Sequence, residues 1–347
     1  MRWSDPPAFL NLERTEMKKL ILLNCVLAAL AATAAQADDR WLVFPPEGTK
    51  TGDAKHVVFI SGDHEYRSEE AFPQLAKILT HHHGFKCTVL FSQDDNGTIN
   101  PENVSNIPGL EALESADLMV LGLRFRDLKE EQMQHIADYV AAGKPIIGLR
   151  TSTHGFSIGK DKKFADWNWN TKGGFGKKYL GETWVDHHGA HGSQSQRGII
   201  APDAADHPIV RGLKSGDVWG PSDVYTVKLP LVDCKPILLG QVLSGMKFDD
   251  APLPGAKNDP MMPIVWTKTY QGENGKEGRV VTSTLGAATD FTAEGSRRMF
   301  VNAAYWAMGL EDKIPEKGAK VDLIGKYEPT QFGFGKYVKG KKPADYK

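Results

Sequence analysis

Three short polar stretches of the sequence, 61–67, 124–126 and 150–154, together supply histidine, carboxylate and guanidinium groups. Imidazole exchanges protons near neutral pH, carboxylates orient or assist such transfers, and guanidinium groups bind hydroxyls or stabilise negative charge. These residue types together suit general acid–base chemistry on a small polar substrate. Polar residues also end strands for purely structural reasons, which is the alternative for each stretch. The candidate site residues in these stretches are His64, Glu65, Arg67, Arg124, Arg150, Thr151 and His154.

The segment Arg150–His154 is the most informative of the three, because it ends a predicted strand at a sharp turn. His154 is its candidate for a general base or a metal ligand. A hydrogen-bonded core histidine or a helix cap explains His154 equally well. Ser152 or Thr153 could act as a nucleophile only if an oriented base activated the hydroxyl, and the sequence does not show that geometry.

A fourth stretch, Glu182–His191, holds three imidazoles and two carboxylates within ten positions. Both groups bind divalent transition metals such as zinc. The spacing matches no strong zinc signature, and two adjacent histidines point in opposite directions along an extended chain. The alternative is that one histidine lies in a pocket while the others are solvated. The candidate metal ligands are His154, His187, His188 and His191.

Two tryptophans, Trp167 and Trp169, lie among amide and acidic side chains in the segment 166–170. Indole faces beside hydrogen-bonding groups suit sugar rings, whose C–H faces are apolar and whose hydroxyls are polar. We therefore include both as candidates for substrate binding. The structural alternative is that they anchor a long loop to the core.

Alternating strand and helix patterns must position these side chains. Apolar runs at 56–60, 86–91, 117–121 and 145–149 predict buried strands. A helix is expected from Ser68, with Pro73 delaying or kinking its start, and another after a capping box of Asp127 and Glu130. Later strands, partly antiparallel, are expected at 198–200, 224–227, 236–239, 263–270 and 279–284, before a final helix at 294–308.

Apolar strands separated by helices predict an α/β fold with a doubly wound parallel sheet and later antiparallel edge strands. Ligands of such sheets bind beyond the carboxyl ends of the strands. The three polar stretches follow the first, third and fourth strands, so we expect them to meet at that edge. Residues 155–196 lack a clear period and are too long for a simple connection, which predicts a functional loop.

Composition places the chain among ordinary globular proteins. The 347 residues are 41% hydrophobic and 24% charged, with a formal net charge of -1. This balance gives no electrostatic footprint for nucleic acid. We expect a small-molecule ligand, and the sequence leaves the oligomeric state open. Cys87 and Cys234 could pair in an oxidising compartment, but neither has metal or redox spacing.

The beginning of the chain has the pattern of a secretory signal. Lys18 and Lys19 precede an apolar run, and the segment 35–37 has the form A-x-A of a cleavage site. No later apolar stretch is long enough to cross a bilayer. We therefore expect an exported, periplasmic or extracellular protein. The expected parts are a leader at 1–37, a linker at 38–54, an α/β domain at 55–310 and a tail at 311–347.

The order and spacing of several segments resemble the ThuA-like family, in the form found in exported proteins of planctomycetes and related bacteria. The resemblance spans residues 55–310. It implies a flavodoxin-like sheet of the class I glutamine amidotransferase type without the amidotransferase cysteine, and a role in the use of trehalose and related disaccharides. The segments are 62–70, 150–154, 187–189, 207–209, Asp223-x-Tyr225, Gly286 and 302–309.

By this resemblance, His154, one of His187 and His188, and the pair Asp223 and Tyr225 are site residues, with Asp223 catalytic and Tyr225 substrate-binding. The chain departs from the family pattern at Ser222-Asp223, where many relatives have Asp-Glu. It departs again at Gly286-Ala287, where relatives have Gly-His, and so lacks one imidazole.

The resemblance implies an enzyme acting on a glycoside or keto-sugar by hydrolase, lyase or isomerase chemistry, with a metal as a candidate helper. A non-catalytic carbohydrate-binding module is the alternative. Glutamine amidotransferase activity is disfavoured because no cysteine stands in the segment 150–154.

Overall fold

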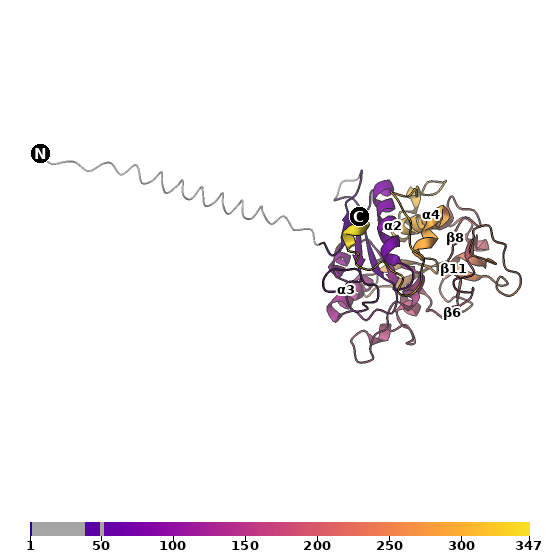
Figure 1. The fold of residues 1–347 in the computed structure, drawn as a ribbon, viewed down its shortest axis with the longest axis horizontal. Helices are drawn as coiled ribbons and strands as arrows, with labels where there is room; N and C mark the ends of the chain where they lie inside the picture. The colour runs from indigo at the N-terminus through magenta and orange to yellow at the C-terminus, as the bar shows by residue number, and fades with distance from the viewer. Residues whose placement is uncertain (2–38, 49–51) are drawn as a thin grey trace. The chain divides into compact units, whose positions relative to one another are not determined.

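A ten-stranded sheet forms the centre of the fold, in the order β1-β3-β2-β4-β5-β12-β11-β10-β7-β8 (Figure 1). Its parallel strands are β3 (Lys86–Phe91), β2 (His56–Gly62), β4 (Leu118–Leu123), β5 (Ile146–Leu149) and β12 (Glu277–Ser283). Antiparallel strands flank them: β1 (Leu42–Phe44), β11 (Met262–Gln271), β10 (Lys235–Val242), β7 (Gln196–Ile200) and β8 (Trp219–Gly220). The predicted α/β class with later antiparallel strands is confirmed.

The structure is a computed structural model that describes Met1, residues 39–48 and residues 52–347. Apart from Met1, the expected leader at 1–37 lies outside the described residues. Residues 40–347 form one compact unit, which includes the segment expected as a C-terminal tail. The segment expected as a linker contributes β1, which pairs with β3 at the edge of the sheet.

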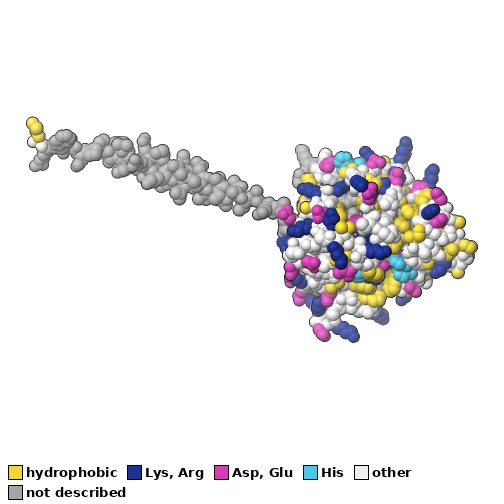
Figure 2. All heavy atoms as spheres, viewed as in Figure 1, with side chains coloured by type: hydrophobic (Ala, Val, Ile, Leu, Met, Phe, Trp, Pro, Cys, Tyr) yellow, Lys and Arg dark blue, Asp and Glu magenta, His cyan; other side chains and the backbone are white. Residues whose placement is uncertain are grey.

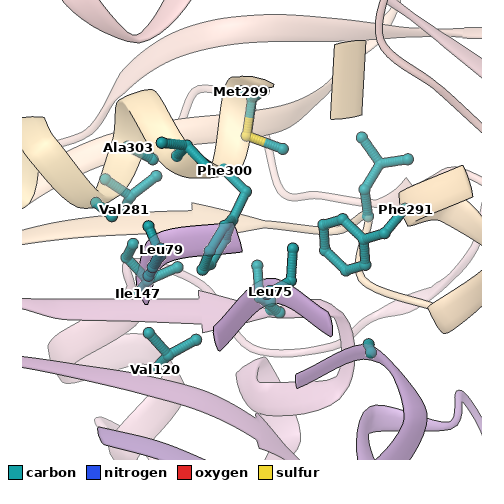
Figure 3. Packing of buried hydrophobic residues seen from close by; sticks show 14 of the residues in the cluster. Leu75, Leu79, Val120, Ile147, Val281, Phe291, Met299, Phe300 and Ala303 are labelled. Carbon is teal, nitrogen blue, oxygen red and sulfur yellow. The ribbon is translucent and has the colours of Figure 1, made fainter. Parts of the chain in front are cut away.

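Helices cover both faces of the sheet, as a doubly wound arrangement requires (Figure 1). One core cluster joins α2 (Ser68–His83) and α4 (Glu294–Ala307) to alternate strand residues such as Val120 and Ile147 (Figure 3). The other cluster joins α3 (Glu130–Ala141) to the strand residues on the opposite face of the sheet, such as Met119 and Ile146. Strands buried on both faces read as continuous apolar runs, which is why the sequence predicted them.

The helix α2 begins at Ser68, as expected, with no delay at Pro73, and Arg67 is its cap residue, with φ 62. The expected capping box of Asp127 and Glu130 is wrong, because Lys129 is the cap residue of α3 and no side chain caps this helix. The carboxylate of Asp127 instead forms an ion pair with Lys162.

The strand expected at 224–227 does not join the large sheet. Its residues Tyr225–Thr226 form β9, which pairs with β6 (Asp186–His187) as a separate two-stranded sheet. In this pairing, His187 lies opposite Tyr225. The irregular segment 155–196 is thereby tied to the segment that carries Asp223.

Within the described residues, none of the helices is long and apolar enough to cross a membrane. Cys87 and Cys234 are both free thiols. Basic and acidic side chains are interspersed on the face shown in Figure 2.

Short helical turns connect the strands and the longer helices. The short turns are Leu110–Ser115, Arg150–His154, Ala165–Trp167, Gly176–Leu180, Pro202–Ala204, Pro208–Val210, Ala288–Thr292, Glu311–Lys313 and Pro343–Tyr346.

Candidate functional site

The loops after β2, β4 and β5 meet at the carboxyl edge of the parallel strands, as the sequence predicted. The amide of Arg124 donates to the carbonyl of Gly62 over 3.0 Å, and the amide of Phe125 donates to the carbonyl of His154 over 3.1 Å. The hydroxyl of Thr151 donates to the carboxylate of Asp63 over 2.5 Å. These bonds join the three loops into one rim.

Asp223 is the centre of the polar cluster at this rim. Its side chain has no exposed surface, and Oδ2 lies 2.7 Å from Nδ1 of His187. Oδ1 lies 2.8 Å from Nη2 of Arg150 and 3.1 Å from Nδ1 of His191. One buried carboxylate therefore contacts two imidazoles and a guanidinium group.

The charge of this carboxylate follows from its neighbours. Burial by itself would raise the pKa of Asp223, but the Arg150 guanidinium and the hydrogen bonds from His187 and His191 outweigh burial and hold it well below its usual range. An ionised carboxylate only accepts hydrogen bonds, so Nδ1 of each histidine carries the proton that it donates. Nε2 of each ring is then turned away from Asp223.

His191 also contacts the first polar loop. Its Nε2 lies 3.5 Å from Oε1 of Glu65, and its side chain is 36% exposed. The hydrogen bond to Asp223 raises the pKa of His191, although burial lowers it. The charge of Glu65 also raises this pKa. Burial raises the pKa of Glu65 itself. The raised pKa values mean that His191 and Glu65 both keep a proton to a higher pH than usual.

Arg150 occupies the strained turn after β5, with φ 47. In α/β folds with a nucleophile at such a turn, this position carries the reactive side chain. Here Nη1 donates to the carbonyls of Asp223 and Thr284, and Nη2 donates to Asp223 and to the hydroxyl of Tyr66. The guanidinium also stacks between the rings of Tyr66 and Tyr225, at 4.3 and 4.0 Å. Arg150 holds the site together and is only 1% exposed.

The hydroxyl that follows in the turn is also committed to the fold. Ser152 Oγ donates to the carbonyl of Leu121 over 2.8 Å and accepts from the amide of Leu123 over 3.2 Å. Its side chain is buried. The turn Arg150–His154 therefore holds no thiol and no exposed hydroxyl.

His64 lies between two guanidinium groups. Nη1 of Arg124 is 2.6 Å from Nε2 of His64, and Nη2 of Arg126 is 3.0 Å from Nδ1. Burial lowers the pKa of His64 to about 4, and the charge of Arg124 adds to this effect. His64 is therefore uncharged at neutral pH and orients Arg124, whose side chain is 17% exposed.

His154 is buried on the inner side of the rim, at 2% exposure. Its ring lies 5.6 Å from Trp184, 5.1 Å from Phe125 and 6.3 Å from Tyr225, measured between ring centroids. Burial lowers the pKa of His154 well below its usual value, and nearby arginine charges add to the effect. No described residue hydrogen-bonds its Nε2.

Two predicted substrate-binding residues are fully buried and bonded within the protein. Arg67 donates to the carbonyls of His64, Glu65 and Gly333. Thr151 donates to Asp63. Both side chains have no exposed surface. They shape the first polar loop and do not face the rim.

The two predicted tryptophans separate. Trp167 lies in the core at 6% exposure, with Phe175 and Tyr179 at 5.0 and 5.7 Å, so it is not brought to the cluster. Its position matches the anchoring alternative. Trp169 is half-buried at the rim, 6.4 Å from Trp184 and 5.5 Å from Phe125.

A candidate cation site lies within the same cluster. The ligand atoms of His187, His191 and Asp223 all lie within 4.8 Å of one another. In the part of the chain that the structure describes, His154 and His188 do not belong to this group. His188 points to the other side of the extended β6, where its Nε2 contacts the carbonyl of Lys257 at 2.7 Å.

Four residues that were not among the sequence candidates also shape the rim: Tyr66, Phe125, Arg126 and Trp184. Trp184 lies within the same ten residues as the histidines, so its position beside them was a usable signal. Phe125 has φ 53, and no local pattern in the sequence predicts this backbone conformation.

Comparison with known proteins agrees with this fold. The family model described as ThuA, trehalose utilisation, matches residues 56–307. A ThuA-like protein from Parabacteroides merdae is 15% identical, with a TM-score of 0.50, and the match covers 78% of this chain and 96% of that one. A ThuA-like protein from Bacteroides uniformis is also 15% identical, with a TM-score of 0.42 and coverage of 75% and 94%. A search of curated proteins finds no significant match.

The family match begins at the first strand of the parallel core and ends with the last residue of α4. It contains every member of the polar cluster around Asp223. The likeness to the Parabacteroides structure, at 15% identity, supports the shared fold. On the extent of the family match, the chain belongs to the ThuA family, which is linked to trehalose utilisation and so to sugar metabolism.

Proposed function

We propose that this protein is an enzyme of carbohydrate metabolism that acts on a glycoside or keto-sugar by general acid–base chemistry. One observation carries the proposal: the buried carboxylate of Asp223 fixes Nδ1 of both His187 and His191. A base that is oriented by a buried carboxylate is an arrangement that suits proton transfer. The link of the family to trehalose utilisation supports a sugar as the substrate.

The cluster offers a separate group for each role. His187, at 37% exposure, presents Nε2 as the proton acceptor. His191 and Glu65 form the proton-donating side, because both have raised pKa values. Arg124 stabilises the negative charge that develops on a substrate oxygen. This assignment covers hydrolase, lyase and isomerase chemistry, which all need a base and an acid.

The roles of two sequence candidates change in this proposal. His64 positions Arg124, since its ring contacts that guanidinium and its pKa is lowered to about 4. His154 forms the back of the rim, and its ring contacts Trp184. Asp223 acts as a positioning residue for the two histidines.

A second candidate function for the same cluster is a metal centre. The ligand atoms of His187, His191 and Asp223 lie within 4.8 Å, which supports a divalent transition metal such as zinc. A bound metal would polarise a substrate carbonyl as a Lewis acid. His187 and His191 would then hold the cation and would not move protons.

Adjacent histidines provide the matched pair for the test of catalysis. Turnover of trehalose, other disaccharides and their 3-keto derivatives is measured with the purified protein, His187→Ala and His188→Ala. We expect His187→Ala to lose about 100-fold or more in rate and His188→Ala to keep full activity. Sugar binding without turnover, unchanged in His187→Ala, would favour the non-catalytic carbohydrate-binding module.

The same variants test the metal centre by elemental analysis after incubation with zinc and gel filtration. A metal centre predicts one zinc per chain in the wild type and in His188→Ala, and loss of zinc in His187→Ala. Turnover by a zinc-free protein in the presence of a chelator would sink the metal candidate and leave the acid–base proposal intact.

We also propose export of the protein, on the basis of the signal pattern at residues 17–37. Expression of the full chain in a bacterial host, followed by cell fractionation and N-terminal sequencing, tests this. A mature protein in the periplasm that begins at Asp38 is expected. An uncleaved chain in the cytoplasm would contradict the proposal.

A further inference from the structure

A C-terminal segment outside the family match crosses the rim of the candidate site. We call residues 330–337 the aromatic strap. The family match ends at residue 307, so the strap lies outside the matched region. Its backbone lies against the first polar loop, where the amide of Gly333 donates to the carbonyl of Glu65 over 2.7 Å. Arg67 donates to the carbonyl of Gly333 over 2.5 Å.

Both ends of the strap are fixed. The amide and hydroxyl of Thr330 each donate to the carboxylate of Glu70, over 2.6 Å. At the other end, the hydroxyl of Tyr337 donates to Oδ1 of Asn100 over 3.0 Å. Anchors at both ends hold the residues between them in one place, so the strap is a fixed part of the rim.

Two phenylalanines of the strap differ in exposure. Phe332 is 3% exposed and packs against Tyr66 and His191, with ring centroids 5.4 and 5.5 Å apart. Phe334 is 57% exposed, although its ring lies 5.5 Å from that of His64. Phe332 thus fixes the strap to the cluster, whereas Phe334 leaves a large apolar face open to solvent beside it.

The open ring of Phe334 lies next to the most accessible guanidinium of the predicted site arginines. The guanidinium carbon of Arg124 is 4.7 Å from the ring centroid of Phe334 and also 4.7 Å from that of Phe125. Phe125 in turn contacts Trp169 at 5.5 Å. The rim therefore presents apolar ring faces on both sides of a hydrogen-bond donor.

We propose that Phe334 is a specificity-determining residue that stacks on the apolar C–H face of a pyranose ring, while Arg124 binds a hydroxyl or carbonyl oxygen of the same sugar. Aromatic faces beside a fixed donor match the alternation of apolar faces and polar edges on a sugar. The inference rests on the proposed function, since it assigns a ligand contact to that site. It makes substrate choice a property of the strap as well as of the matched domain.

Binding of a sugar panel tests the inference by isothermal titration calorimetry. The panel holds trehalose, maltose, sucrose and their 3-keto derivatives, and the proteins are wild type, Phe334→Ala, Phe334→Trp and Phe248→Ala. Phe248 is the matched control, because it is also an exposed phenylalanine, at 48%, and contacts Trp219 and Arg197 outside the cluster. Thermal unfolding of each variant checks that the fold is kept.

We expect Phe334→Ala to weaken the best ligand by about tenfold, which corresponds to the loss of one aromatic stacking contact. Phe334→Trp keeps or strengthens binding, and Phe248→Ala leaves it unchanged. Equal affinity in Phe334→Ala and the wild type would overturn the inference while the proposed function stands. A wild type that binds no sugar of the panel would overturn both.

Discussion

Nδ1 of His187 lies 2.7 Å from Oδ2 of Asp223, so a carboxylate without exposed surface holds a histidine that is 37% exposed. The pairing of β6 with β9 sets this contact, because it places His187 opposite Tyr225, two residues after Asp223. A short two-stranded sheet thus joins the surface histidine to the buried charge beneath it.

Replacement of Asp223 by alanine is expected to destabilise the fold. The variant leaves the guanidinium of Arg150, 1% exposed, without its anionic partner. Loss of one member of a buried ion pair costs about 3–5 kcal/mol in the free energy of unfolding. Urea unfolding followed by circular dichroism measures the change. The control Glu328→Ala removes the surface partner of Lys326 and should leave stability unaltered, so equal losses in both variants would contradict the role given to Asp223.

Acid is expected to destabilise the protein between pH 6.5 and pH 4. Burial lowers the pKa of His56, His64 and His207 to about 4 in each case. These rings bind protons in the unfolded chain below about pH 6.5 but in the folded chain only near pH 4, so the free energy of unfolding falls as the pH decreases.

Urea unfolding at pH 7 and pH 4.5 measures this decrease. His56→Gln should show a smaller loss between the two pH values than the wild type, because one titrating group is removed. The variant His135→Gln, at a half-buried histidine, serves as the control. An identical loss in the wild type and His56→Gln would refute the assignment to His56.

Gly122→Ala is expected to cost about 1–3 kcal/mol of stability by overpacking. A Cβ atom at Gly122 would lie 2.5 Å from Cζ of Phe72 and 2.9 Å from Cβ of Ser68, and Phe72 is buried. The control Gly159→Ala meets only the side chain of Lys162, at 3.9 Å, and should be neutral. Urea midpoints compare the two, and a neutral Gly122→Ala would show that β4 and α2 are packed more loosely than described.

Thr330→Val is expected to loosen the aromatic strap without unfolding the domain. The variant loses the hydroxyl that donates to the Glu70 carboxylate, and a buried acceptor without its donor is unfavourable. Hydrogen exchange of residues 330–337 should become faster, while exchange in β2 and β4 stays slow. Thr98→Val, at a hydroxyl that bonds to no described residue, is the control. Unchanged exchange in the strap would contradict this role of the Thr330 hydroxyl and show that the other contacts of the strap are sufficient to hold it.

Much of the fold was predictable from the sequence because buried strands and helix faces have recognisable patterns of apolar residues. Strands such as β2, buried at all seven positions, read as continuous apolar runs. The meeting of the loops after β2, β4 and β5 followed from parallel pairing. The polar partners within the cluster were not predictable, because nothing near His187 in the sequence selects Asp223, 36 positions later. The positive φ of Arg150 and the exposed ring of Phe334 likewise depend on contacts between distant segments.

The bond between Thr330 and Glu70 joins residues 260 positions apart. When Glu70 emerges from the ribosome, its partner is therefore still far from being synthesised. A nascent chain that stops before residue 330 can pair β2, β3, β4 and β5 but has no segment to cover the loop of Glu65 and Arg67. The rim of the site thus acquires this contact only after residue 330 has been translated.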